Sequence, residues 1–216
     1  MSEFIKHAYK LSSIPRFVSN TLTSPYSVGE HTFRAAMLAM AIIDDYNDKN
    51  PKKPINFEEV MKKILLHDIE ESVTGDIPSP VKKEGDLRPR LRQANKTILK
   101  RDILVDSPRP KEYLSLWDKD KEGETGQVVK IVDKLEGLFA AYFEVKNGNW
   151  YLQEPMMKHL EWFESPQGQR LLNKFNYAKQ EYQEVVRFLL NQDNEKKKRQ
   201  EKVENLLSRY SKKKKE

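Results

Sequence analysis

The stretch FEEVMKKILLHDIEES, residues 57–72, starts as an amphipathic helix and then places two ionisable residues where its apolar face should continue. The apolar residues at helical spacing are Phe57, Val60, Met61, Ile64 and Leu65. His67 and Asp68 follow them directly. Because burying an ionisable pair costs free energy unless partners hold it, either ordinary hydrogen-bond partners neutralise this pair or it binds a metal ion.

Helical periodicity extends outward from this stretch over most of the chain. Ser27 and Glu30 form a capping-box pattern that predicts a helix start at residue 27. Asn56 and Glu59 give a weaker start signal for the helix from Phe57. Helical segments are predicted near residues 4–12, 27–46, 57–74, 90–106, 112–120, 127–147, 149–165 and 167–192. No segment alternates like a strand, so we predict an all-α bundle of about seven or eight helices.

The composition of the chain narrows its class. Its 216 residues are 38% hydrophobic and 33% charged, with the apolar residues spread periodically, which is typical of a globular protein. There is no cysteine, so disulfides, thiolate metal sites and cysteine nucleophiles are excluded. No apolar run approaches a membrane span, and the first residues lack the apolar core of a signal peptide. We therefore expect a cytoplasmic protein with no membrane contact.

The net charge of +6 is concentrated at one end of the chain. Residues 193–216 carry ten Lys and Arg against five Asp and Glu, which leaves residues 1–192 with a net charge of only +1. We therefore predict a globular domain over 1–192 and a basic tail over 193–216. A nucleic-acid-binding protein driven by that tail is the alternative of another class, and the nearly neutral domain makes it the weaker one.

Three of the predicted apolar helix faces carry ionisable residues. His31 lies on the inward stripe of the helix from Ser27, His67 and Asp68 on the next, and Asp133 on the long helix near residues 127–147. Two imidazoles and two carboxylates suit Mn, Fe, Co, Ni or Zn, and such a metal activates water as a nucleophile near neutral pH. Taken singly, each histidine is more often a hydrogen-bonded core residue, and Asp133 more often an ion-pair partner.

The order His31, His67-Asp68, Asp133 resembles the metal-binding signature of the HD-domain phosphohydrolases. The stretches SVGEH at 27–31 and HDIEESVTGDIPSPVK at 67–82 are similar to the bacterial 5′-deoxynucleotidase branch of that class, the YfbR-like group. Arg16 stands at the distance before His31 that this group shows. The resemblance covers about residues 10–145 and implies an HD-type helical domain within 1–192.

The resemblance also implies a role for each matching residue. His31, His67, Asp68 and Asp133 would hold one divalent transition metal (Co, Mn, Fe, Ni or Zn, with Mg as an assay substitute). Glu71 would orient or deprotonate the attacking water or protonate the leaving oxygen, whereas Glu70 is predicted to face solvent. The substrate side would be formed by Arg16 and the weaker candidate Lys82 at the phosphate, and by Asp76 at the sugar 3′-hydroxyl.

Phe17 is where the chain departs from the group's pattern, which has Trp after the arginine. A smaller ring weakens the inference of a strict preference for deoxyribose. We therefore expect a nucleotide phosphohydrolase acting on 5′-(deoxy)nucleotides, with hydrolysis of nucleoside or nucleotide-analogue triphosphates on the same scaffold as the alternative. A single metal is expected because no histidine lies between Asp68 and Asp133. A homodimer is expected because members of the group are commonly dimers.

Overall fold

The computed structural model describes residues 1–191 and confirms the all-α fold, with no strand in that range. The chain divides into a compact unit Met1–Ala178 and a second unit that begins at Lys179. The described part of the second unit, residues 179–191, is helical. The predicted basic tail 193–216 lies outside the described residues. Within the described part, no helix has the length and apolar character needed to cross a membrane.

The helices are more numerous than predicted, mainly because several are short. The α-helices are α1 (Glu3–Lys10), α2 (Val28–Lys49), α3 (Phe57–Leu66), α4 (Glu71–Thr74), α5 (Ser79–Lys82), α6 (Leu87–Ile98), α7 (Pro110–Asp118), α8 (Gly123–Lys146), α9 (Gln153–Glu164) and α10 (Pro166–Lys174), followed by a helix over 176–191. Single turns of other helix types are η1 (Leu11–Ser13), η2 (Leu99–Ile103) and η3 (Trp150–Leu152).

The predicted helix 57–74 is interrupted, which corrects the prediction of one continuous element. After Leu66 the backbone forms a tight turn, in which the Ile69 amide donates to Leu66 and the Glu71 amide donates to Asp68. Leu66 and Ile69 are buried on either side of the turn, whereas Leu65, still within α3, is 53% exposed, contrary to the periodicity. Phe57 is also exposed, contrary to the periodicity. His67 and Asp68 thus lie in a turn rather than on a helix face.

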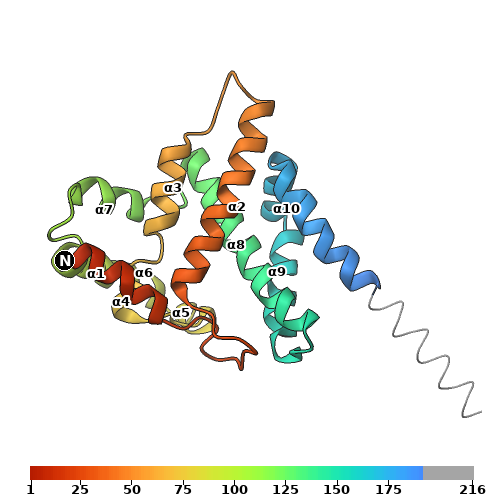
Figure 1. The fold of residues 1–216 in the computed structure, drawn as a ribbon, viewed down its shortest axis with the longest axis horizontal. Helices are drawn as coiled ribbons and strands as arrows, with labels where there is room; N and C mark the ends of the chain where they lie inside the picture. The colour runs from red at the N-terminus through yellow and green to blue at the C-terminus, as the bar shows by residue number, and fades with distance from the viewer. Residues whose placement is uncertain (192–216) are drawn as a thin grey trace, which may run out of the picture. The chain divides into compact units, whose positions relative to one another are not determined.

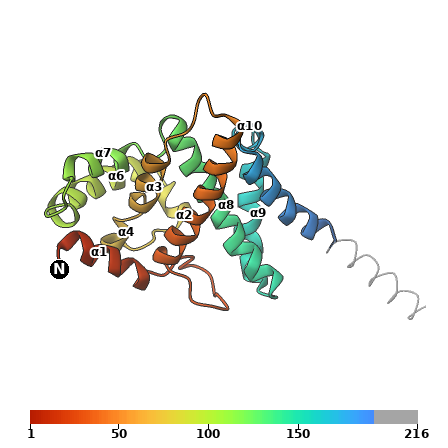
Figure 2. The same ribbon diagram turned by 45° about the horizontal axis from the view of Figure 1, so that its top comes forward.

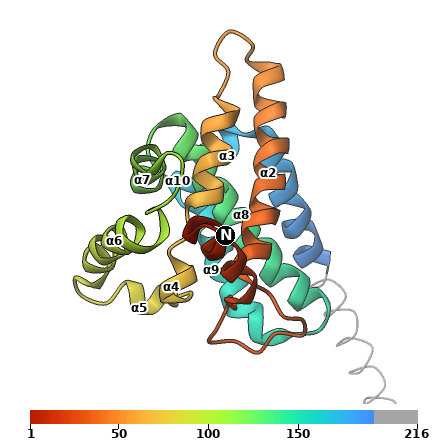
Figure 3. The ribbon, with the colours of Figure 1, turned by 60° about the vertical axis from the view of Figure 1, so that its left-hand side comes forward.

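Helices α2, α3 and α8 pack against one another at the centre of the first unit (Figures 1 and 2). Helices α9 and α10 lie on one side of this trio. Helices α4, α5, α6 and α7 lie on the other side (Figures 1 and 3), and α7 packs against α3. Helices α2 and α8 and the turn that directly follows α3 carry the predicted ligands, so the packing of these helices decides where those side chains meet.

Backbone hydrogen bonds join residues 14–16 to residues 26–28 at the start of α2. The Arg16 amide donates to Tyr26 and the Val28 amide donates to Ile14, which closes residues 14–28 into a loop. Ser27 caps α2 in a full capping box with Glu30, as the sequence predicts. These hydrogen bonds hold the two ends of the loop together, and they place Arg16 beside the first turn of α2.

Candidate metal centre and active site

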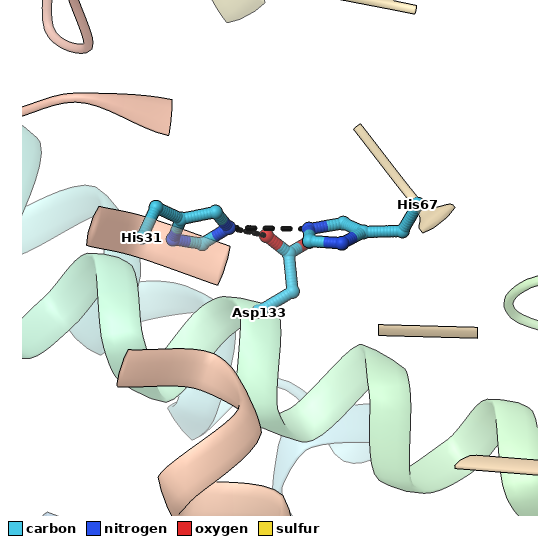
Figure 4. Close-up of side chains that lie close together, drawn as sticks. All are labelled: His31, His67 and Asp133. Carbon is cyan, nitrogen blue, oxygen red and sulfur yellow. Dashed lines mark hydrogen bonds and ion pairs between the residues drawn. The ribbon is translucent and has the colours of Figure 1, made fainter. Parts of the chain in front are cut away.

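The structure brings His31, His67 and Asp133 together although they are far apart in the sequence (Figure 4). One potential ligand atom from each lies within 4.8 Å of the others. The Nε2 atoms of His31 and His67 are 3.2 Å apart, and Oδ1 of Asp133 is 3.7 Å from Nε2 of His31. Both histidines are buried. The constellation therefore forms a polar centre between α2, the end of α3 and α8.

Asp68 completes the centre from the turn after α3. Its Oδ2 atom lies 3.1 Å from Nε2 of His67 and 3.6 Å from Nε2 of His31. The same oxygen accepts a hydrogen bond of 3.0 Å from Nη1 of Arg16. Asp68 thus lies against both histidines, and the predicted phosphate-binding arginine lies against Asp68.

The second nitrogen of each histidine is held by the protein. Nδ1 of His31 donates to Oε2 of Glu136 at 2.5 Å, and the Tyr26 hydroxyl donates to the same oxygen at 2.5 Å. Nδ1 of His67 donates to the carbonyl of Ile64 at 2.6 Å. Donation through Nδ1 leaves each Nε2 with a lone pair, and this arrangement is typical of histidines that bind metals. Sequence reasoning did not identify Glu136 or Tyr26.

The two facing Nε2 atoms explain why the centre suits a cation. Lone pairs 3.2 Å apart repel unless a proton or a metal ion lies between them. Burial lowers the pKa of His67, but the Asp68 carboxylate outweighs burial and raises it to about 9, which favours a second proton on the His67 ring when no metal ion is bound. A metal ion would replace that proton. Two imidazole nitrogens and two carboxylates form a donor set that suits borderline transition metals.

Glu71 lies beside the centre as the first residue of α4. Its side chain is buried, and Oε1 accepts from Nζ of Lys82 at 3.2 Å. Its Oε2 atom has no hydrogen-bond partner among the described residues. Burial and the nearby Asp68 carboxylate raise the pKa of Glu71 to about 8. A buried carboxyl with one unpartnered oxygen and a pKa near neutrality is suited to exchanging protons with a water molecule or substrate.

Glu70 does not face solvent, so the prediction for this residue was wrong. Its Oε2 atom accepts from the indole nitrogen of Trp117 at 2.8 Å, and its Oε1 atom accepts from Nδ2 of Asn95 at 3.3 Å. Trp117 is fully buried in a cluster with Leu66 and Ile69. Glu70 therefore ties the turn that bears Asp68 to α6 and α7, which is a structural role.

The other predicted substrate-binding residues lie around the same centre. Asp76 follows Gly75, whose φ is positive. The negative charge of Asp76 raises the pKa of both Arg16 and Glu71, so Asp76 lies near these two residues. Phe17 itself has a positive φ of 52°, uncommon for a residue with a side chain, and its ring stacks on Tyr26 at 6.0 Å between centroids. The structure thus places Asp76 near the polar centre and Phe17 behind Tyr26.

A cavity of about 480 Å³ adjoins the polar centre without containing it. Phe17, Tyr26 and Glu136 line it together with residues of α2 and the second half of α8. None of the four predicted ligands lines it. Two of its lining residues, Tyr26 and Glu136, also contact Nδ1 of His31, so they separate the cavity from the candidate metal centre.

An all-α core in which α2, the turn after α3 and α8 bring His31, the His67-Asp68 pair and Asp133 together is the arrangement expected of an HD-domain phosphohydrolase. The family model described as "5′-deoxynucleotidase YfbR-like" matches residues 3–176. The chain belongs to this family. The predicted class, fold and phosphohydrolase activity are thereby confirmed.

Individual relatives agree with this placement. The chain is 29% identical over 182 residues to the 5′-deoxynucleotidase HDDC2 of Danio rerio, covering 82% of this chain and 86% of the relative. A conserved hypothetical protein from Pyrococcus furiosus aligns with a TM-score of 0.64 at 26% identity over 86% of this chain and 98% of the other. The cyanophage S-2L HD phosphohydrolase DatZ, solved with dA and one catalytic Zn²⁺, shares the fold at a TM-score of 0.56 and 18% identity, covering 84% and 96%.

Proposed function

We propose that the protein is a metal-dependent 5′-(deoxy)nucleotidase that releases inorganic phosphate from nucleoside 5′-monophosphates. The observation that carries the proposal is the cluster of His31, His67 and Asp133, with Asp68 in contact with both histidines and with the Arg16 guanidinium. Beside Asp68 lies the buried carboxyl group of Glu71, which has one unpartnered oxygen among the described residues. Phosphoryl transfer requires positive charge around the phosphate and a positioned proton acceptor, and these groups provide both.

The four clustered residues would hold one divalent metal, for which Co, Mn, Fe, Ni and Zn are the candidates and Mg an assay substitute. When bound, the metal would supply Lewis acidity that activates water and offsets phosphate charge. The chain's own residues set the geometry. Glu136 and the Ile64 carbonyl fix the histidine rings, so both Nε2 atoms point at the same position.

Arg16 is proposed to bind the phosphate. Its guanidinium is held in the site by Asp68 and has a planar fork that matches two phosphate oxygens. Lys82 is proposed as a second phosphate contact, since its ammonium lies 3.2 Å from Oε1 of Glu71. Asp76 is proposed to accept a hydrogen bond from the sugar 3′-hydroxyl. Phe17 is proposed to border the sugar, where its smaller ring permits some ribonucleotide hydrolysis.

Glu71 is proposed to accept the proton of the attacking water and to transfer it to the leaving group. A water oxygen forms a bond to phosphorus while Oε2 of Glu71 accepts one of its protons, and the bond from phosphorus to O5′ breaks. Glu71 then returns this proton to the leaving O5′, so that the products are a nucleoside and inorganic phosphate. A carboxyl with a pKa near 8 can both accept and return a proton around neutral pH.

Product analysis separates this activity from triphosphate hydrolysis. Incubation of the metal-loaded protein with dAMP is expected to yield deoxyadenosine and phosphate, and dAMP is expected to be a better substrate than AMP. Ion-exchange chromatography after incubation with dATP would distinguish tripolyphosphate from single phosphates. Inactivity on dAMP combined with tripolyphosphate release from dATP would contradict the monophosphatase proposal and favour the triphosphohydrolase.

The quaternary structure and the location of the protein remain predictions. We propose a homodimer in the cytoplasm, as expected from the resemblance and the composition. Nucleic-acid binding by residues 193–216 is the weaker alternative, and it falls outside the described residues.

A further inference from the structure

Lys121 contacts one of the four clustered residues from a turn that the sequence motifs do not include. Its Nζ atom donates to Oδ2 of Asp133 at 2.9 Å, across twelve positions of the chain. The other oxygen of the same carboxylate, Oδ1, lies 3.7 Å from Nε2 of His31. The two oxygens of Asp133 thus have different partners, one toward the metal centre and one toward an ammonium group.

Two glycines explain how Lys121 reaches so far along the chain. Gly123 has a φ of +70°, which lets the turn before α8 fold back over the helix. At Gly126 a Cβ would lie only 2.3 Å from the carbonyl carbon of Lys121, so the backbone of Lys121 rests directly on α8. Asp133 lies seven residues, or about 10 Å, further along that helix. The Lys121 side chain covers part of that distance, and its Nζ atom meets Oδ2 of Asp133.

Each of the other clustered residues already has an anchor that is not itself a ligand. His31 is held by Glu136, His67 by the carbonyl of Ile64, and Asp68 by Arg16. Among the residues described by the structure, Lys121 is the side chain that donates a hydrogen bond to Asp133. Lys121 therefore completes the set of anchors, and it does so from outside the sequence motifs of the site.

We propose that Lys121 is a positioning residue that holds Asp133 with Oδ1 directed at the metal and Oδ2 turned away. The inference rests on the metal site of the proposed function. Residues that orient a metal ligand in this way typically contribute about 10- to 100-fold to metal affinity or activity. Without the ammonium, the carboxylate is free to rotate and to offer both oxygens to the metal.

The experiment compares Lys121→Met with Lys121→Arg and with Lys119→Met, which removes an exposed lysine from the same turn. Co²⁺ binding is measured by calorimetry, and the visible absorption of the Co²⁺-loaded protein reports the coordination number. Lys121→Met is expected to bind Co²⁺ about 10- to 100-fold more weakly and to show weaker absorption bands. Lys121→Arg is expected to restore most of the affinity, and Lys119→Met to match the wild type.

Kinetics on dAMP at saturating Co²⁺ give an independent measure. A positioning role predicts a lower kcat for Lys121→Met with an almost unchanged KM. A raised KM with unchanged Co²⁺ affinity would assign Lys121 to the phosphate and overturn the proposal. Tighter Co²⁺ binding by Lys121→Met would also overturn it, because the ammonium would then oppose the metal. Failure of the wild type itself to bind Co²⁺ would overturn the proposed function as a whole, which is a distinguishable result.

Discussion

Asp68→Ala is expected to abolish measurable phosphate release from dAMP. The substitution removes the oxygen that lies between both histidines and Arg16, at 3.0 to 3.6 Å from each. The loss should exceed the roughly 10- to 100-fold effect of removing a residue that only orients a ligand. Metal content of the purified protein, measured by mass spectrometry, should fall in parallel with activity.

Two further variants show whether the effect of Asp68→Ala is specific. Asp68→Asn keeps the shape of the side chain and should also lose activity, because the amide is a poor metal ligand and leaves Arg16 without its counter-charge. Asp44→Ala removes an exposed carboxylate from α2, the helix that bears His31, and should leave activity unchanged. Full activity in Asp68→Ala would refute the assignment of the metal ligands.

Glu71→Gln is expected to lower kcat by about 10²- to 10⁴-fold, which is the usual contribution of a general acid or base. Metal content should stay at the wild-type level, since the structure gives Glu71 contact with Lys82 rather than with the histidines. The rise of wild-type activity as the pH increases toward 8, where Glu71 loses its proton, should disappear in the variant.

Glu84→Gln is the matched control for Glu71→Gln, because Glu84 is an exposed carboxylate in the turn just after α5. It should retain the activity, the metal content and the pH profile of the wild type. If Glu71→Gln kept kcat within about threefold of the wild type while Asp68→Ala remained inactive, Glu71 would have no part in proton transfer, and its pKa would reflect burial alone.

The parts of the fold that follow from local rules could be predicted from the sequence. The Ser27–Glu30 capping box and the Asn56 cap begin their helices as predicted, and Gly75 ends α4 with a positive φ. The small residue Gly137 lets α9 approach α8 closely, since a Cβ there would lie 2.6 Å from the ring of His159 on α9. Such features depend on residues close in sequence or on the size of one side chain.

The errors and omissions arose where distant parts of the chain meet. The helical register made Glu70 a solvated residue, but the turn after Leu66 rotates it toward Trp117, which arrives from α7. Glu136 was missed although it lies one turn after Asp133, because its partner His31 belongs to another helix. A carboxylate next to apolar residues on the buried face of α8 was the one local signal that could have identified it.

The central claim is tested most directly by removing and restoring the metal in the wild-type protein. Phosphate release from dAMP is measured after chelator treatment and dialysis, and again during titration with Co²⁺ or Mn²⁺. We predict that activity is lost on chelation and returns to a plateau at one metal equivalent per chain. Undiminished phosphate release from the metal-free protein, or no release from dAMP at any metal concentration, would contradict the account.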